Sequence, residues 1–159
     1  MKRPLFAFLF VLGSLALTAM AQAQVLVIAN PSVKSADVSK SDLRDVFSGN
    51  ASSLSDGSRV TPVLLKGGAV NDEFLSTYIG KNDTAFRASW RSLVFSGQAS
   101  MPKSLDSDEA MVDYVAHNAG AIGYISKAAP HEGVKVLNVR QADAELSGSQ
   151  ARCHENCND

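Results

Sequence analysis

The chain has 159 residues, of which 45% are hydrophobic and 19% are charged, with 11 glycines and 5 prolines. These values are typical of ordinary globular domains, and they exclude wholesale disorder, collagen-like repeats and a membrane protein with several spans. The formal net charge is -1, so the chain has no basic excess of the kind that binds nucleic acid.

The first 23 residues have the composition of a secretory signal peptide. Two basic residues precede an apolar run over residues 5–17, and two A-x-A patterns then place the start of the mature chain at Gln22 or Gln24. An uncleaved anchor is the alternative, but the apolar run is shorter than the about 20 residues that a span needs. We therefore expect an exported, periplasmic protein whose mature chain has 13 basic and 16 acidic residues.

The first half of the mature chain alternates strands and helices. Residues 25–29 form an apolar, β-branched run that predicts a strand, and an Asn-Pro pair ends it. Residues 39–47 place apolar side chains on one face after a capping box that begins at Ser39, which predicts a helix. A second apolar run over residues 60–65 predicts another strand.

Three further helices are expected after this strand. Their predicted buried stripes are Phe74, Leu75, Tyr78 and Ile79; Phe86, Trp90, Leu93 and Val94; and Met111, Val112, Val115 and Ala116. The second of these helices begins at Asp83 or Thr84, and the third begins with a capping box at Asp106. Residues 98–103 are expected to form an irregular connection.

Two strands complete the predicted order of elements, one over residues 120–126 and one over residues 134–137. Strands that alternate with helices predict an α/β domain whose sheet is mixed or parallel and is flanked by helices. We expect this domain to cover residues 24–138. The remaining residues, 139–159, are polar, and we expect them to form a loosely held tail.

Both cysteines lie in this tail, at Cys153 and Cys157. Because an exported chain meets an oxidising compartment, a local disulfide between them is expected. One alternative is a small zinc or copper site made by Cys153, His154 and Cys157, and the other is free or intermolecular thiols. The spacing matches no usual zinc-binding cysteine pair, so we expect no bound metal and no other cofactor.

Two loops that follow predicted strands carry the candidate binding residues. The candidate anion-binding residues are Asn30, Ser32, Lys66, Gly67, Gly68 and Asn71. A glycine pair between a strand and a helix can aim backbone N–H groups at an anion, and Lys66 adds a full positive charge, although Gly-Gly also forms ordinary turns. Ligands of open parallel sheets bind beyond the carboxyl ends of the strands, so we expect one pocket between the two loops.

Motifs of common enzymes are absent from the sequence, which has no G-x-S-x-G elbow, no Walker loop and no H-E-x-x-H. The adjacent acids Asp72-Glu73 and Asp108-Glu109 each fall in the first turn of a predicted helix, where acids are favoured by the helix dipole. Trp90 is expected to belong to the core. We therefore expect a protein that is not an enzyme.

Five stretches between residues 25 and 138 carry a family resemblance. They are the Leu-x-x-Val-Phe-x-Gly element in Ser41–Gly49, the segment Asp56–Val63, the pair Phe74-Leu75, the Trp90 helix and the Gly-Ala-Ile-Gly-Tyr-Ile-Ser run at Gly120–Ser126. They resemble the small periplasmic phosphate-binding-protein-like domains, which are similar to shortened substrate-binding components of phosphate ABC transporters. The resemblance implies a periplasmic-binding-protein-like fold of mostly one lobe.

The same resemblance implies a non-enzymatic binding protein that takes phosphate or a related oxyanion, with an ABC permease or another membrane protein as its partner. It also implies that the ligand is held by residues 30–32 and by residues 66–71. The hydroxyl-bearing Ser-Gly-Thr element of the family is replaced here by Gly67-Gly68-Ala69-Val70, and much of the second lobe is missing. The alternative is a protein-interaction or sensory accessory module that kept the scaffold without ligand binding.

Overall fold

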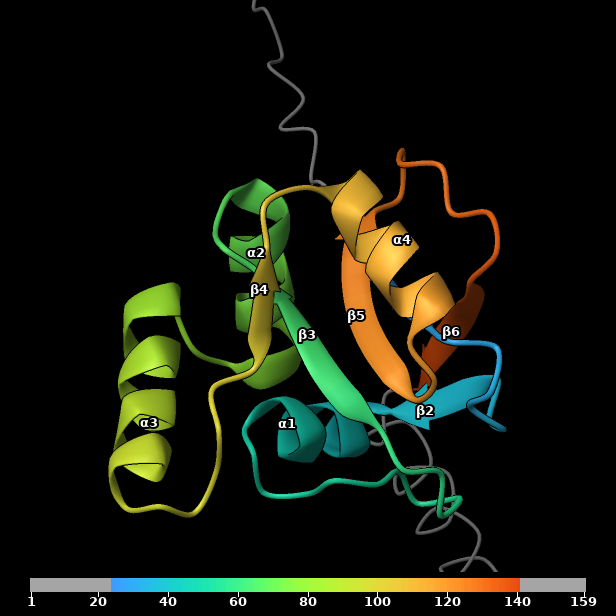
Figure 1. Cartoon of the computed structure of the whole chain (residues 1–159). Coiled ribbons are helices and arrows are strands. Elements are labelled where there is room, and N and C mark those ends of the chain that lie inside the picture. Colours follow the sequence, from blue (N-terminus) through green and yellow to red (C-terminus); the bar gives the residue numbers. More distant parts are fainter. Residues whose placement is uncertain (1–23, 141–159) are drawn as a thin grey trace, which may run out of the picture.

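The computed structural model describes residues 24–140, in which helices cover both faces of a six-stranded sheet (Figure 1). The strands are β1 (Val25–Ala29), β2 (Asp37–Ser39), β3 (Thr61–Leu65), β4 (Lys103–Leu105), β5 (Ala121–Ser126) and β6 (Lys135–Arg140). The helices are α1 (Lys40–Phe47), α2 (Ala69–Phe74), α3 (Asp83–Phe95) and α4 (Asp108–His117), and η1 (Leu75–Ile79) is a π-helical turn that continues α2. The predicted α/β architecture is confirmed. The expected signal peptide and the Cys153–Cys157 tail lie outside the described residues.

The direction of β1 differs from that of the other strands of this sheet. The strand order is β2-β6-β1-β5-β3-β4, and β1 pairs antiparallel with both β5 and β6. All the other pairings are parallel: β2 with β6, and β3 with β4 and β5. The five strands β2 to β6 therefore end at one side of the sheet, which we call the carboxyl edge. β1 ends at the opposite side, which we call the amino edge.

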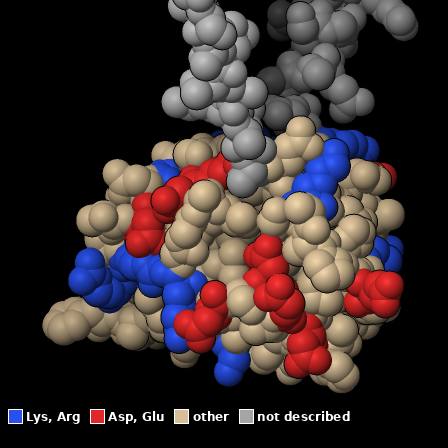
Figure 2. Space-filling model, turned by 90° about the horizontal axis from the view of Figure 1, so that it is seen from above, with Lys and Arg blue, Asp and Glu red and all other residues tan. Residues whose placement is uncertain are grey.

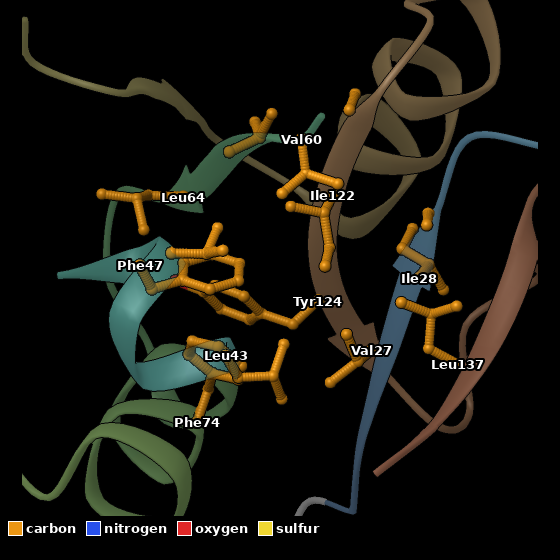
Figure 3. Close-up of a cluster of buried hydrophobic side chains, with 14 of the residues drawn as sticks. Val27, Ile28, Leu43, Phe47, Val60, Leu64, Phe74, Ile122, Tyr124 and Leu137 are labelled. Atoms are coloured by element: carbon orange, nitrogen blue, oxygen red, sulfur yellow. The ribbon is translucent and has the colours of Figure 1, made fainter. Parts of the chain in front are cut away.

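Alternating residues of β5 pack against different helix layers. Tyr124 points to the α1 and α2 side, where its ring stacks on Phe74 with centroids 3.8 Å apart and lies 5.9 Å from the Phe47 ring (Figure 3). The preceding residue, Gly123, faces α4, and a Cβ built there would lie 2.5 Å from the Met111 Sδ. Because successive residues of a strand point to opposite faces, α4 covers the face opposite α1 and α2. Burial of each aromatic ring contributes about 1.5–3 kcal/mol to folding.

The helix starts follow capping chemistry, with one shift from the prediction. The Ser39 side chain accepts a hydrogen bond from Asp42 N at 3.0 Å, as the capping box predicts. α3 begins at Asp83, as predicted, and Asn82 caps it. The cap of α4 is Ser107 rather than Asp106, because the Ser107 hydroxyl reaches the Ala110 N–H at 3.2 Å.

Two strands were missed and one prediction about burial is wrong. The strands β2 and β4 were not predicted, since three residues are too few to show an alternating pattern. Val94 was expected in the buried stripe of α3, yet it is 42% exposed. The buried anchors of α3 are Phe86 and Trp90, both nearer its start.

Candidate functional site

The two loops that were expected to share a pocket lie at opposite edges of the sheet. Residues 30–32 follow β1 at the amino edge, where Asn30 N donates to Ala121 O at the start of β5. Residues 66–71 follow β3 at the carboxyl edge, where Lys66 N donates to Leu105 O at the end of β4. The expectation of one pocket is therefore wrong, because β1 and β3 run in opposite directions.

The loop at the amino edge has hydrogen bonds that hold the fold together. Asn30 is 7% exposed, and its Nδ2 donates to the carbonyls of Val115 at 2.8 Å and Ala116 at 2.9 Å near the end of α4. Its Oδ1 accepts from Ser32 N at 2.9 Å, and the Ser32 hydroxyl accepts from Gly120 N at 3.0 Å. These contacts join β1 to α4 and to the start of β5.

The loop at the carboxyl edge presents a glycine turn to solvent. Lys66, Gly67 and Gly68 are all exposed, and Gly68 is the residue that caps the start of α2. Gly68 has a φ of 96°, a conformation that favours glycine, and no side chain caps this helix start. The first N–H groups of α2 therefore face the edge of the sheet without the side-chain oxygen that usually covers them.

Two charged contacts hold Lys66. Its ammonium lies 2.7 Å from the Asp106 carboxylate, which follows β4 at the same edge, and both side chains are well exposed. Its carbonyl accepts a hydrogen bond from the Arg87 guanidinium at 2.6 Å. The main chain of the turn is thus tied to α3, while the Lys66 side chain spans the ends of β3 and β4. An exposed pair of this kind contributes only about 0–1 kcal/mol, so a competing anion can displace Asp106.

Asn71, the sixth candidate residue, is buried beneath the turn with 2% of its surface exposed. Its Oδ1 accepts from the Tyr124 hydroxyl at 2.7 Å, and that hydroxyl in turn accepts from Leu65 N at 3.1 Å. Its Nδ2 donates to Asp83 Oδ1 at 3.1 Å, and the other oxygen of Asp83 accepts from Arg87 Nε at 2.7 Å. The side chain of Asn71 therefore supports the turn from inside.

The pKa shifts in this network follow from burial and charge. Burial raises the pKa of the Tyr124 hydroxyl, which stays protonated and donates to Asn71. The hydrogen bond from Arg87 lowers the pKa of Asp83, so the carboxylate is charged at neutral pH. Both groups are therefore in the protonation state that their hydrogen bonds require.

A second helix start lies at the carboxyl edge, on the other face of the sheet. α4 begins two residues after Asp106, and Asp108 Oδ2 accepts from Ser126 N at 3.1 Å at the end of β5. The starts of α2 and α4 thus flank the carboxyl ends of β3, β4 and β5. Crevices of this kind are where open α/β sheets bind ligands. Acidic and basic side chains are mixed over the face seen in Figure 2, which looks down on this edge.

The remaining predictions about chemistry can be compared with the described residues. The acids Asp72, Asp108 and Glu109 lie in first helical turns, as predicted, whereas Glu73 lies later in α2. Trp90 is 4% exposed, as expected for the core. Among residues 24–140, no group of three or more potential metal ligands occurs. Within the same range, no helix is long and apolar enough to cross a membrane. The candidate disulfide or metal residues of the tail lie outside the description.

Solved structures of similar fold are phosphate-binding proteins of transport systems. A phosphate ABC transporter substrate-binding protein with bound phosphate from Clostridium perfringens has a TM-score of 0.56 and 16% identity over 79% of this chain and 50% of its own. An ABC-type phosphate transport receptor from Vibrio cholerae has a TM-score of 0.55 and 14% identity, and the match covers 72% of this chain and 45% of the receptor. PstS from Borrelia burgdorferi has a TM-score of 0.53 and 13% identity, and the match covers 80% of this chain and 52% of PstS.

The chain has a periplasmic-binding-protein-like fold. At these identities the likeness concerns the fold alone, and the chain spans about half the length of the three solved structures. No protein-family model matches the sequence, and no curated protein is similar enough to count as a relative. This periplasmic-binding-protein-like domain therefore corresponds to part of its structural neighbours, in agreement with the expected single lobe.

Sequence reasoning missed the groups that position the turn. Asp106 was assigned to a helix cap, whereas its carboxylate pairs with Lys66. Arg87 was not singled out and Asp83 was interpreted only as a helix start, although their spacing of four residues in a helix is a recognised signal for an ion pair. Contacts between residues distant in sequence, such as Arg87 with Lys66, leave no local pattern.

Proposed function

We propose that this chain is an exported, non-enzymatic domain that binds phosphate or a related oxyanion at the carboxyl edge, between the Lys66-Gly67-Gly68 turn and Asp106. The observation that carries the proposal is the exposed helix start at Gly68, which has no side-chain cap and lies beside a lysine. Backbone N–H groups and the helix dipole favour negative charge at such a place. The phosphate-binding function of the structural neighbours supports the same ligand class.

The expected affinity is weak for two physical reasons. The turn is open to solvent, so each hydrogen bond to the anion competes with water. An anion that binds must also compete with the Asp106 carboxylate for the Lys66 ammonium. Low ionic strength strengthens the binding because salt screens exposed charges.

The Lys66–Asp106 pair provides a test with opposite expected signs. Asp106→Asn frees the lysine and removes a repelling carboxylate, so phosphate affinity rises about three- to fivefold, while Lys66→Gln lowers it by a similar factor. Isothermal titration calorimetry at low salt measures both changes. Lys34→Gln, which removes the same charge from the loop at the amino edge, leaves the affinity unchanged.

Equal losses in Lys66→Gln and Lys34→Gln would mean that phosphate responds to net charge alone, and the carboxyl-edge site would be rejected. A loss of affinity in Asp106→Asn would also contradict the proposal, because the carboxylate would then be a ligand-supporting group rather than a competitor.

The second candidate function is a protein-interaction or sensory module without ligand binding. It is favoured by the hydrogen bonds that engage the side chain of Asn71, which leave the carboxyl-edge site with few polar groups of its own. Absence of heat with phosphate, for a protein that circular dichroism shows to be folded, would favour this function. The expected partner of such a module is an ABC permease or another membrane protein.

A further inference from the structure

A groove between α1, η1 and α3 gathers positive charge and hydroxyl groups away from the carboxyl-edge turn. Its volume is about 540 Å³, which is within the range of pockets that bind small molecules. Ile79, at the end of η1, is buried and lines it together with the half-buried Leu93 of α3. Arg44 of α1 and Lys81, which follows η1, bring two positive charges to it.

The other lining side chains are neutral and polar. Ser48 and Ser92 contribute hydroxyl groups and Asn50 contributes an amide, while the Ser89 hydroxyl already donates to Ala85 O at 3.0 Å. No carboxylate is among the described residues that line this groove. A groove of similar volume beside α4 differs in this respect, since its lining includes Glu109, Asp113 and Glu132.

No ion pair among the described residues neutralises the two positive charges of this groove. Within residues 24–140, the described ion pairs include neither Arg44 nor Lys81. The contact of the Lys81 ammonium is a hydrogen bond to the Ser89 hydroxyl at 2.8 Å. Two cations that share a groove without a counter-charge repel one another, and an anion between them removes that repulsion.

Capping of helix ends does not account for these cations. Basic residues often serve the free carbonyls of a final helical turn, but those of α1 already accept hydrogen bonds. The Arg44 carbonyl accepts from Ser48 N at 2.9 Å, and the Asp45 carbonyl accepts from Asn50 N at 2.8 Å. The Val46 carbonyl accepts from Gly49 N at 3.2 Å, and the Phe47 carbonyl accepts from Trp90 Nε1 at 2.9 Å. At η1, the Lys81 ammonium donates to the Ser89 hydroxyl, and none of the described hydrogen bonds joins it to a carbonyl of that turn.

We propose that this groove binds an anionic carbohydrate, a polyhydroxyl molecule that carries a phosphate or carboxylate group. A guanidinium and an ammonium recognise the anionic group, and serine hydroxyls with an amide match the hydroxyl groups of the ligand. The volume exceeds what an inorganic ion fills, which separates this site from the one at the carboxyl edge. The site is independent of the proposed phosphate site, because none of its lining residues belongs to the Lys66–Gly68 turn.

Amide NMR spectra of the mature protein, titrated with glucose 6-phosphate, glucuronate and neutral glucose, test this site. The expected result is a saturable shift of the Ser48, Asn50 and Ser92 amides with at least one of the two acids, and a smaller response to glucose. The acid that binds more tightly shows whether the groove prefers phosphate or carboxylate. Arg44→Gln and Lys81→Gln each weaken binding about fivefold or more.

Two control variants separate this site from general charge effects and from the carboxyl edge. Arg91→Gln removes an equal charge from an exposed position of α3 that does not line the groove, and Lys66→Gln removes it from the carboxyl edge. Both leave the binding of the acids to the groove unchanged. The proposal is overturned if neither acid gives a saturable shift, if glucose binds as well as the acids, or if either control weakens binding as much as Arg44→Gln.

Discussion

Individual side chains at the strand ends divide into those that build the fold and those that remain open to a ligand. Asn30, Ser32 and Asn71 each hold backbone or side-chain groups of distant segments. Lys66 and Gly68 stay exposed. The sequence could not separate these two classes, because an asparagine that follows a strand looks the same whether its amide meets a carbonyl or an anion.

The Tyr124 hydroxyl allows the contribution of the buried hydrogen-bond network to stability to be measured. Tyr124→Phe leaves Leu65 N–H and Asn71 Oδ1 without a partner in the interior, so the free energy of unfolding falls by about 1–3 kcal/mol. Urea denaturation measures this change. Tyr114→Phe, at a half-buried position, is the matched control and changes stability by less than about 0.5 kcal/mol. Equal effects of the two variants would contradict the role assigned to the network.

A second prediction at this scale concerns acid. Hydrogen bonds from the Ser35 hydroxyl and the Ser58 N–H, at 2.7 and 2.8 Å, lower the pKa of Asp56 to about 2. A carboxyl whose pKa is lowered on folding stabilises the protein above the unfolded pKa of about 3.9, and this contribution is lost as the pH falls toward 2. Asp56→Asn therefore shows a smaller loss of stability than the native chain between pH 4 and pH 2. Parallel stability curves for the two proteins would contradict the assignment.

At the scale of elements, the sequence was sufficient to predict the caps and glycines at the ends of the helices, and also the longer strands. The run at β5 and the Ser39 cap are local patterns that match the structure. The strands β2 and β4 were not readable, because three residues pair only where a neighbouring strand provides the partner. The π-helical turn at η1 was also not predicted, since its buried Leu75 and Ile79 fit an ordinary helix.

The attachment of α3 gives a prediction for this scale. Trp90 is 4% exposed, packs on Gly49 and donates to Phe47 O, whereas Phe95 on the same helix is 97% exposed. Trp90→Ala lowers the free energy of unfolding by about 3–5 kcal/mol. Phe95→Ala changes it by less than about 0.5 kcal/mol. Thermal and urea unfolding compare the two, and a near-neutral Trp90→Ala would contradict the anchoring role.

For the whole molecule, the direction of one strand determines where a ligand can bind. Composition and element order were sufficient for an α/β sheet with helices on both faces, and the family resemblance agreed with the fold. Neither could show that β1 runs against its neighbours, because strand direction depends on how the chain crosses the sheet. The two candidate loops consequently lie at opposite edges, and the carboxyl edge retains an open helix start beside Lys66.

The most direct test of oxyanion binding at this edge is an amide NMR titration of the mature protein with inorganic phosphate at low ionic strength, with chloride as the control. We predict saturable shifts of the Gly67, Gly68 and Ala69 amides that chloride does not produce. Shifts confined to residues 30–32 at the amino edge, or no saturable shift in a folded protein, would contradict the account.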